Sequence, residues 1–352
     1  MEIILLGIFL HFVGGLASGS FYIPFKGVRH WAWESYWLVG GLFSWLVVPL
    51  IAAIITVPDF ARILAEAQVS TLGWTYLFGV LWGIGGLTFG LTMRYLGLSL
   101  GMSVIMGLTS AFGALMPPLY RDLFGDCGAY SLSAMAQSLG GALVLVGVAV
   151  SLVGIAICGW AGVLKEREVD EATKLASVSE FSLRKGGTVA LISGVLSACF
   201  SYGIAAGRPL AEAAVASGAN DLFQNNVTFM VIMWGGLTTN AIWCLSLGFK
   251  NRSYTDYADR RTPLARNYLL CALAGTIWFL QFFFYGMGES RLGNDASSWV
   301  LHMSFIIVVS NLWGLYFREW QGTSRGNRQV LLVGIVVILS SICLVGYGNY
   351  LG

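Results

Sequence analysis

The sequence is poor in charged residues and rich in hydrophobic ones. Asp, Glu, Lys and Arg account for 11% of its 352 residues, whereas hydrophobic side chains account for 57%, and the mean hydropathy is +0.74. A soluble protein of this length needs far more charge on its surface, so this composition excludes a soluble enzyme or a soluble binding domain. The net charge of +2 gives no indication of a nucleic-acid partner. We therefore expect a polytopic membrane protein.

The sequence also lacks the residue patterns of metal sites, disulfide frameworks and enzymes. Its six cysteines include no Cys-X-X-Cys pair and no Cys/His ligand spacing. No Ser/His/Asp or Cys/His set has a spacing that suits nucleophilic catalysis. The glycine-rich run at residues 83–86 lacks the Lys-Ser/Thr ending of a phosphate loop. No basic segment precedes the first apolar run, as a cleavable signal would require. We expect neither an enzyme nor a cofactor or metal.

Ten apolar stretches are long enough to cross a bilayer, which takes about 20 residues at a rise of 1.5 Å per residue. They are expected near residues 3–25, 35–57, 71–93, 97–119, 137–161, 187–207, 226–249, 267–288, 298–317 and 329–350. The seven prolines lie mostly at span ends, but Pro49 falls inside the second span, where we expect a kink or break. The 45 glycines suit closely packed membrane helices. The predicted fold is an all-α polytopic membrane protein with ten transmembrane helices.

The connections between these spans differ sharply in Lys and Arg content. Alternate connections carry only four of the 20 basic residues, at positions 62, 121, 208 and 291. The remaining connections carry 16, which are Lys26, Arg29, Arg94, Lys165, Arg167, Lys174, Arg184, Lys185, Lys250, Arg252, Arg260, Arg261, Arg266, Arg318, Arg325 and Arg328. Because short cytoplasmic connections retain Lys and Arg, the basic set is predicted to face the cytoplasm. Both termini then lie on the outer side.

The two halves of the chain resemble each other. Trp82, Phe89-Gly90 and Gly97 recur 196 positions later as Trp278, Tyr285-Gly286 and Gly293. In the first and sixth spans, Gly14, Leu16, Tyr22 and Gly27 recur 180 positions later as Gly194, Leu196, Tyr202 and Gly207. Five spans per half is an odd number, so the second copy must be inverted, an arrangement common in transporters. We predict a first five-helix repeat at residues 1–161, a cytoplasmic linker at 162–186 and a second five-helix repeat at 187–352.

Runs of consecutive residues give a more specific resemblance than these single-residue matches. The first connection contains Phe21-Tyr22-Ile23-Pro24-Phe25-Lys26 and then Trp31-Ala32-Trp33-Glu34, which resemble the first-loop signature of the L-rhamnose–proton symporters. Gly90-Leu91-Thr92-Met93-Arg94-Tyr95-Leu96-Gly97 resembles the third-loop signature of the same family, and residues 280–285 and 301–305 are similar to its eighth and ninth spans. The similarity covers essentially the whole chain. The sequence thus resembles this family of the drug/metabolite transporter superfamily.

The resemblance implies ten helices in two inverted halves, with spans 1–4 and 6–9 around a central cavity. It also implies secondary active transport in the bacterial inner membrane, with a small sugar and a proton as partners, lipid around the helices and no other cofactor. The chain departs from the enterobacterial members at Gly86 and Ala205, where they carry polar side chains, and at Glu289, where they carry histidine. Because Gly86 and Ala205 are expected to line the cavity, the identity of the sugar stays open.

A sugar presents hydroxyl groups above apolar C–H faces, so its site needs polar side chains beside an aromatic platform. Gln281 lies among aromatic residues deep in the eighth span, and Trp278 and Tyr285 share its helical face at i−3 and i+4. Each also has an alternative role in helix packing or interhelical hydrogen bonding. The substrate-binding candidates are Gln281, Trp278, Tyr285, Trp82, Asn240 and Asn311.

Proton coupling needs a membrane-embedded group that can titrate and that each side reaches in turn. His11 in the first span and His302 in the ninth lie toward the outer side, whereas Glu34 begins the second span on the cytoplasmic side. These three are the proton-coupling candidates, and we expect Glu34 and the histidines at opposite ends. Alternatively, the histidines are packing residues, and Glu34 is a helix-start carboxylate or an ion-pair partner of Lys26 or Arg29.

Other polar residues near span ends are expected to be structural. Asn225 and Asn226 are interpreted as end caps of the seventh span. Glu289 is expected to pair with Arg291 in solvent at the outer end of the eighth span. Arg94 is expected to anchor the cytoplasmic end of the third.

The leading hypothesis is proton-driven import of L-rhamnose or a related small sugar by alternating access. Two alternatives stay open at this point. One is a drug or metabolite exporter of the same fold, and the other is a sugar-binding membrane receptor without net flux.

Overall fold

The computed structural model describes residues 1–96, 98–124, 131–168, 183–317 and 320–351, and within these ranges all regular structure is helical. The first half contains α1 (Glu2–Ser20), α2 (Tyr22–Phe25), α3 (Trp33–Leu42), the π-helical η1 (Phe43–Val47), α4 (Val48–Thr56), α5 (Phe60–Glu66), α6 (Val69–Leu96), α7 (Leu98–Phe124), α8 (Leu132–Gln137) and α9 (Leu139–Glu168). The second half contains α11 (Leu183–Ala206), α12 (Arg208–Ala216), η2 (Asp221–Phe223), α13 (Asn226–Asn251), η3 (Ser253–Ala258), α14 (Leu264–Leu292), α15 (Asp295–Tyr316) and α16 (Arg325–Leu351).

The all-α prediction is confirmed for the described residues. Nine helical segments among them are long and apolar enough to cross a membrane, and they coincide with nine of the ten expected spans. The fourth expected span coincides with α7, a 27-residue helix that is not one of the nine. The count of ten is compatible with this result and stays a prediction. Most of the expected linker, residues 169–182, lies outside the described residues.

The expected break near Pro49 is present in the second span. Five residues of π-helix, Phe43–Val47, separate α3 from α4, and Pro49 lies in the first turn of α4. Proline has no N–H to donate to the carbonyl four residues earlier, and its ring collides with that carbonyl. A local π turn accommodates both effects without ending the helix.

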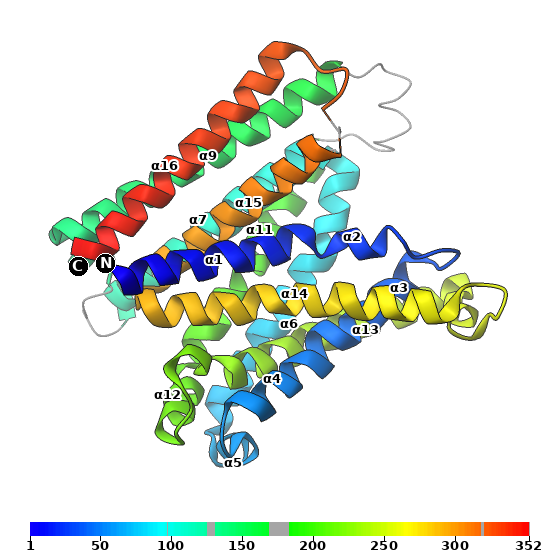
Figure 1. Cartoon of the computed structure of the whole chain (residues 1–352), viewed down its shortest axis with the longest axis horizontal. Coiled ribbons are helices and arrows are strands. Elements are labelled where there is room, and N and C mark those ends of the chain that lie inside the picture. Colours follow the sequence, from blue (N-terminus) through cyan, green and yellow to red (C-terminus); the bar gives the residue numbers. More distant parts are fainter. Residues whose placement is uncertain (97, 125–130, 169–182, 318–319, 352) are drawn as a thin grey trace.

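The long helices pack in a reciprocal pattern. In the first half, α1 packs against α14 and α15, and in the second half α11 packs against α6 and α7. Likewise α6 packs on α13, as α14 packs on α3, while α9 and α16 lie side by side along their length (Figure 1). Each half thus places its first helix against the third and fourth helices of the other. Two related halves would pack in this way, so the pattern supports the predicted duplication.

Two glycines 196 positions apart make equivalent contacts. A Cβ on Gly79 of α6 would lie 2.1 Å from the carbonyl oxygen of Ile232 in α13. A Cβ on Gly275 of α14 would lie 2.1 Å from the carbonyl oxygen of Gly40 in α3. Only glycine allows helix backbones to approach so closely. The shared offset with Trp82 and Trp278 further supports the predicted repeat.

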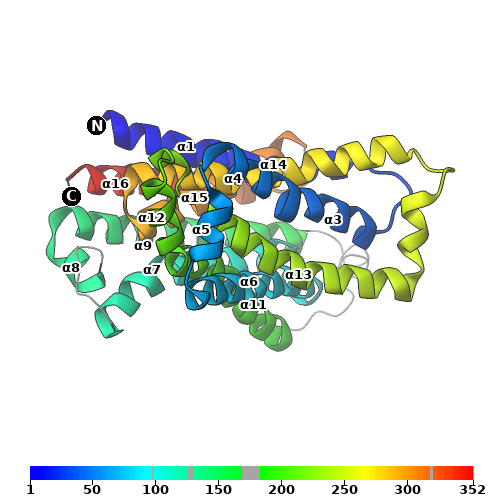
Figure 2. The ribbon, with the colours of Figure 1, turned by 90° about the horizontal axis from the view of Figure 1, so that it is seen from below.

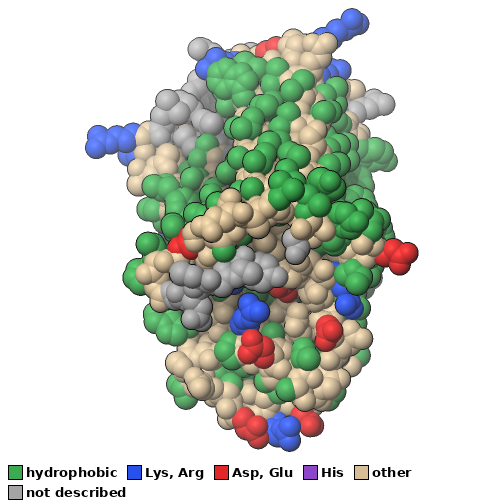
Figure 3. Space-filling view, turned by 90° about the vertical axis from the view of Figure 1, so that its left-hand side faces the viewer, with side chains coloured by type: hydrophobic (Ala, Val, Ile, Leu, Met, Phe, Trp, Pro, Cys, Tyr) green, Lys and Arg blue, Asp and Glu red, His purple; other side chains and the backbone are tan. Residues whose placement is uncertain are grey.

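The two ends of the bundle differ in what they carry. Figures 1 and 2 show both chain termini at one end, which we call the terminal end. The opposite end, here called the basic end, carries the connection 26–32, η3 and residues 259–263 (Figure 1). Seen toward the terminal end, acidic and basic side chains are scattered over the lower part of the face (Figure 3). Exposed ion pairs lie there on α5 and α12, between Arg62 and Glu66 and between Arg208 and Glu212.

Packing is densest in the half of the bundle nearest the terminal end. All residues of α13 from 226 to 233 are buried, and so are all residues of α15 from 296 to 305. In the last twelve residues of α13, toward the basic end, only Asn240 and Cys244 are buried. Continuous burial means that other helices surround α13 and α15 on every side near the terminal end. Side chains of the surrounding helices therefore cover the centre of the bundle on its terminal side.

Candidate functional site

An aromatic cluster fills the centre of the bundle, where helices of both halves meet. Trp82 of α6 lies 5.5 Å from Trp278 of α14, measured between ring centroids. Phe282, one turn further along α14, lies 4.1 Å from Phe200 of α11 in a stacked geometry. Offset and edge-on aromatic contacts of this kind stabilise a packed interior. Trp82 and Trp278, which occupy equivalent positions in the two predicted repeats, thus contact each other directly.

The open space beside this cluster is small. A pocket of about 10 Å³ is bordered by Trp37, Trp45, Trp278 and neighbouring residues of α2, α3, η1 and α14. That volume is roughly enough for one water molecule. This pocket is therefore too small for a monosaccharide, which can enter it only when the aromatic side chains or the helices move.

Gln281 is 4% exposed and lies beside this cluster on α14. Its backbone carbonyl lies 2.8 Å from a Cβ placed on Gly14 of α1, so α1 and α14 are in close contact here. Within the described part of the chain, its side-chain amide forms no hydrogen bond. A buried amide without a protein partner is costly, so Gln281 is available for a polar ligand.

His11 of α1 and His302 of α15 face each other across the bundle interior. Both side chains are 0% exposed, and their ring centroids are 6.1 Å apart. Tyr285 lies close to both, at 5.3 Å from His11 and 5.2 Å from His302. The structure therefore brings together two histidines that were separate proton-coupling candidates, and Tyr285 lies beside both.

None of the four imidazole nitrogens of this histidine pair has a hydrogen-bond partner among the described residues. The backbone of His11 nevertheless lies close enough to act on the His302 ring, so the alternative role of the histidines in packing stays open. Glycines allow the rings to sit so deep: a Cβ on Gly288 would lie 2.8 Å from Nε2 of His11, and one on Gly14 would lie 3.1 Å from Cε1 of His302. Buried polar atoms without partners are rare and often mark sites that bind protons or ligands.

Glu34 lies at the basic end, away from the histidine pair. Its Oε1 accepts hydrogen bonds from Asn251 Nδ2 at 2.9 Å and from Ser253 Oγ at 2.7 Å. The structure thus gives Glu34 neutral partners from the connection between α13 and α14. Among the described residues, it forms no ion pair with Lys26 or Arg29. Its separation from the histidines agrees with the expected arrangement.

A second carboxylate, that of Asp256, connects the two halves at the same end. Asp256 Oδ2 accepts hydrogen bonds from the backbone N–H of Ala32 at 2.8 Å and from Ser35 Oγ at 2.7 Å. A carboxylate at the N-terminus of α3 satisfies donors that the helix leaves free. We call the bonds of Glu34 and Asp256 the basic-end latch, because they fasten α3 to η3 across the two halves.

The two asparagine candidates already have protein partners. Asn240 accepts a hydrogen bond from Trp37 Nε1 at 3.1 Å and donates one to the carbonyl of Gly236 at 2.9 Å. Asn311 donates to the carbonyl of Ile307 at 2.8 Å and is half-buried. These contacts fit the alternative role in helix packing. The substrate role of both residues stays a prediction.

The expected pairing of Glu289 with Arg291 is wrong, and of the two expected end caps only Asn225 takes the N-cap position of α13. Neither asparagine forms a side-chain cap on α13: Asn226 donates to Thr56 of α4 at 2.8 Å, and Asn225 Nδ2 donates to Glu289 Oε2 at 2.7 Å. Glu289 forms no ion pair with Arg291 among the described residues, and Arg291 Nε is buried without a partner. Glu289 was expected in solvent because it lies close to the predicted end of the eighth span. Its i+4 spacing from Tyr285 was the signal that it shares the inward face.

Two further expectations concern positions outside the buried centre. Gly86 and Ala205 are both exposed, and a Cβ on Gly86 would meet no atom within 4 Å. Their exposure does not place them against the aromatic cluster, and the expectation that they line the cavity stays a prediction. The side chain of Arg94, the expected anchor of the third span, lies outside the described residues.

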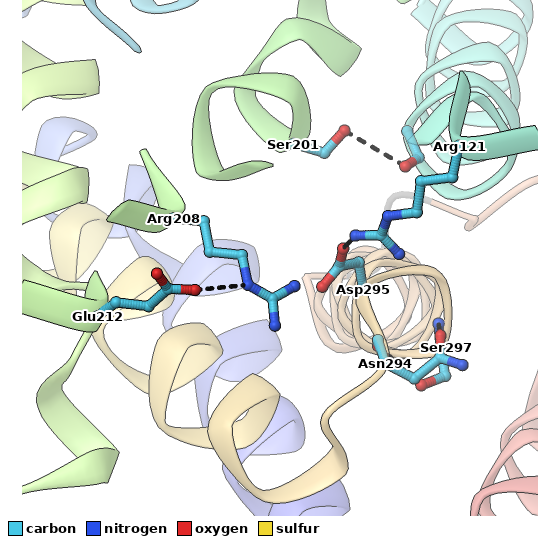
Figure 4. A network of polar contacts seen from close by, with 8 residues as sticks. Arg121, Ser201, Arg208, Glu212, Asn294, Asp295 and Ser297 are labelled. Carbon is cyan, nitrogen blue, oxygen red and sulfur yellow. Dashed lines mark hydrogen bonds and ion pairs between the residues drawn. The ribbon is translucent and has the colours of Figure 1, made fainter. Parts of the chain in front are cut away.

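The terminal end is closed by contacts between α7 and α15 (Figure 4). Arg121 in the last turn of α7 forms an ion pair with Asp295 in the first turn of α15. One turn deeper, Trp299 Nε1 donates to the carbonyl of Thr109 at 3.0 Å. Arg208 of α12, which pairs with Glu212 at 3.4 Å, points toward the same region in Figure 4. Both ends of the bundle are therefore fastened across the two halves.

Membrane-length helices that close at both ends around buried polar and aromatic side chains define a multi-pass membrane transporter rather than an enzyme. The model of the L-rhamnose-proton symport protein family matches residues 1–350. The chain is 40% identical over 350 residues to the L-rhamnose-proton symporter of Cronobacter sakazakii, with 98% of each chain covered. It is 38% identical to the L-rhamnose-proton symporters of Yersinia pestis and Yersinia pseudotuberculosis, again over 350 residues and with 98% of each chain covered.

The protein belongs to the L-rhamnose-proton symport protein family. The resemblance of its first-loop and third-loop strings to this family is thus confirmed. Membership establishes a multi-pass transporter of the inner membrane, and it does not favour the exporter or the receptor that the sequence left open.

Proposed function

We propose that this protein imports L-rhamnose or a closely related deoxysugar together with protons by alternating access. The observation that carries the proposal is the histidine pair, which is fully buried and lacks hydrogen-bond partners among the described residues. Tyr285, which contacts both histidines, lies one helical turn from Gln281 on α14, and Phe282 of the aromatic cluster lies 6.5 Å from His302. The names of the relatives point to the same sugar and the same coupling ion.

The sugar site is proposed at the junction of Gln281 with Trp278, Trp82 and Tyr285. Trp82 and Trp278 would provide apolar faces for the C–H side of the sugar, as aromatic platforms do in other sugar sites. The Gln281 amide and the Tyr285 hydroxyl, which make no protein hydrogen bond in the described structure, would bind sugar hydroxyls. Asn240 is assigned a structural role, because Trp37 and Gly236 occupy its amide.

The proton site is proposed at His11 and His302 acting together. Glu34 is assigned to the basic-end latch, since its carboxylate is occupied by Asn251 and Ser253. The basic end would face the cytoplasm and the terminal end the periplasm, as the distribution of Lys and Arg predicts. Opening of the Arg121–Asp295 contact would admit sugar and proton, and opening of the basic-end latch would release them.

Uptake of radiolabelled L-rhamnose into proteoliposomes tests this function. An imposed inward pH gradient should drive accumulation above the external concentration, and a protonophore should abolish it. Competition by other monosaccharides and by nucleosides ranks the substrates. Uptake that is unchanged by the protonophore would refute proton coupling. Absence of L-rhamnose uptake under every gradient would refute L-rhamnose as the substrate.

A further inference from the structure

Glu289 lies inside the membrane-length helix α14, near the histidine pair. It follows Tyr285 by one helical turn, and Tyr285 contacts both histidines. The preceding residue, Gly288, forms the surface on which the His11 ring packs, with 2.8 Å between a Cβ placed there and Nε2. Glu289 is therefore the carboxylate next to the proposed proton site on its terminal side.

Asn225 holds the Glu289 side chain in this position. Its Nδ2 donates to Oε2 of Glu289 at 2.7 Å, and the Asn225 side chain is 5% exposed. The bond connects the start of α13 with α14, and the positive end of the α13 dipole lies beside the carboxylate. Among the described residues, no second hydrogen bond to Glu289 is formed, so Oε1 is free to take a proton.

The charged groups around Glu289 come from four other elements. Asp295 of α15 and Arg208 of α12 act electrostatically on Glu289, and they oppose each other in sign. Asp295 is itself paired with Arg121 of α7, and Arg208 with Glu212 (Figure 4). On the α1 side the nearest titratable group is His11, and α14 itself contributes Tyr285 and Arg291. Glu289 thus stands between the charged terminal end and the uncharged interior.

We propose that Glu289 is a further proton-binding residue of the transport cycle, which accepts the proton at the terminal end and passes it to the histidine pair, with Asn225 as its positioning residue. The inference rests on the proposed symport function. In the accepting step, Oε1 takes a proton from a hydronium ion of the outer solvent, which leaves as water, and the carboxylate becomes a neutral acid. In the second step, that O–H bond breaks and an imidazole nitrogen gains the proton, through the Tyr285 hydroxyl or a water molecule. The carboxylate and its bond from Asn225 are then restored.

The test compares wild type with Glu289→Gln in proteoliposomes. Glutamine keeps the shape and can still accept the bond from Asn225, but it cannot release a proton. We expect proton-driven accumulation of L-rhamnose to fall at least about tenfold, while sugar counterflow, which needs no net proton movement, stays close to the wild-type rate. The pH profile of uptake should flatten in Glu289→Gln and return in Glu289→Asp.

The matched control is Glu66→Gln, whose side chain lies at the same end but is 71% exposed; it should behave as wild type. Asn225→Ala should shift the pH profile of uptake without abolishing counterflow. If Glu289→Gln accumulates sugar with the wild-type pH profile, or if it loses counterflow as well, Glu289 is not a proton-binding residue. Failure of the wild type to couple uptake to protons would instead overturn the proposed function.

Discussion

The basic-end latch makes a prediction about Glu34→Ala that needs no assumption about the substrate. Glu34 is 6% exposed, and its Oε1 accepts two hydrogen bonds, from Asn251 and Ser253. Alanine removes both acceptor contacts between α3 and the connection that follows α13. The bonds of Asp256 to Ala32 and Ser35 remain. The basic end should therefore open more often without unfolding.

The size of the effect follows from what each donor loses. A hydrogen bond to a charged acceptor contributes about 1.5–3 kcal/mol. Asn251 is exposed and bonds to water when the carboxylate is gone, whereas Ser253 is 7% exposed and is left without its acceptor. We therefore expect a total cost of about 2 kcal/mol. Since 1.4 kcal/mol corresponds to a factor of ten, the open fraction should rise about 30-fold.

Hydrogen–deuterium exchange of the purified protein in nanodiscs measures this opening. The backbone amides of residues 33–36 and 253–258 should exchange about 30-fold faster in Glu34→Ala than in wild type. Glu2→Gln is the control, because Glu2 is exposed at the start of α1. Equal exchange in wild type and Glu34→Ala at both segments would refute the reasoning, because the two bonds would then contribute nothing to closure.

Three further changes have measurable outcomes. Gln281→Ala should weaken L-rhamnose binding about 10- to 100-fold, as loss of one buried hydrogen-bonding group does; an unchanged Kd removes Gln281 from the site. His11→Asn, His302→Asn and the double variant should lose proton-driven uptake to the same extent, because residues that act as a unit are not additive; independent, additive losses contradict a shared site. Gly275→Ala should lower the free energy of unfolding by about 1–3 kcal/mol through overpacking, whereas Gly86→Ala should not change Tm; equal Tm values for both contradict the described packing.

The helices could be predicted from the sequence because their signals are local. Apolar length located α1, α9 and α16, and Pro49 located the interruption of the second span. Each of these follows from the bilayer thickness or from the missing proline N–H, neither of which depends on distant residues. The fourth expected span was located in the same way, since α7 covers residues 98–124.

The site could be predicted only in part, because its contacts join distant residues. Gln281 and Trp278 could be identified because they share a helical face and lie among aromatic residues of the same helix. The contact of His11 with His302 spans 291 positions, and the bond of Asn225 to Glu289 spans 64. Such pairs depend on which helices touch and at what depth, which sequence periodicity does not specify. The error at Glu289 arose in this way, because Glu289 was interpreted from its place near a span end.

Burial of the histidine pair gives the proposed coupling a physical basis. A charged imidazole needs hydrogen-bond acceptors, and none is bonded to His11 or His302 in the described structure. An uncompensated buried charge costs several kcal/mol, so a proton alone is unfavourable in the closed state. Sugar hydroxyls bound beside Gln281 and Tyr285 would supply acceptors, and the charged imidazoles would in turn strengthen sugar binding. Because this linkage is reciprocal, each ligand raises the affinity for the other. Closure with only one of them bound is then disfavoured, which is the condition that separates symport from a proton leak.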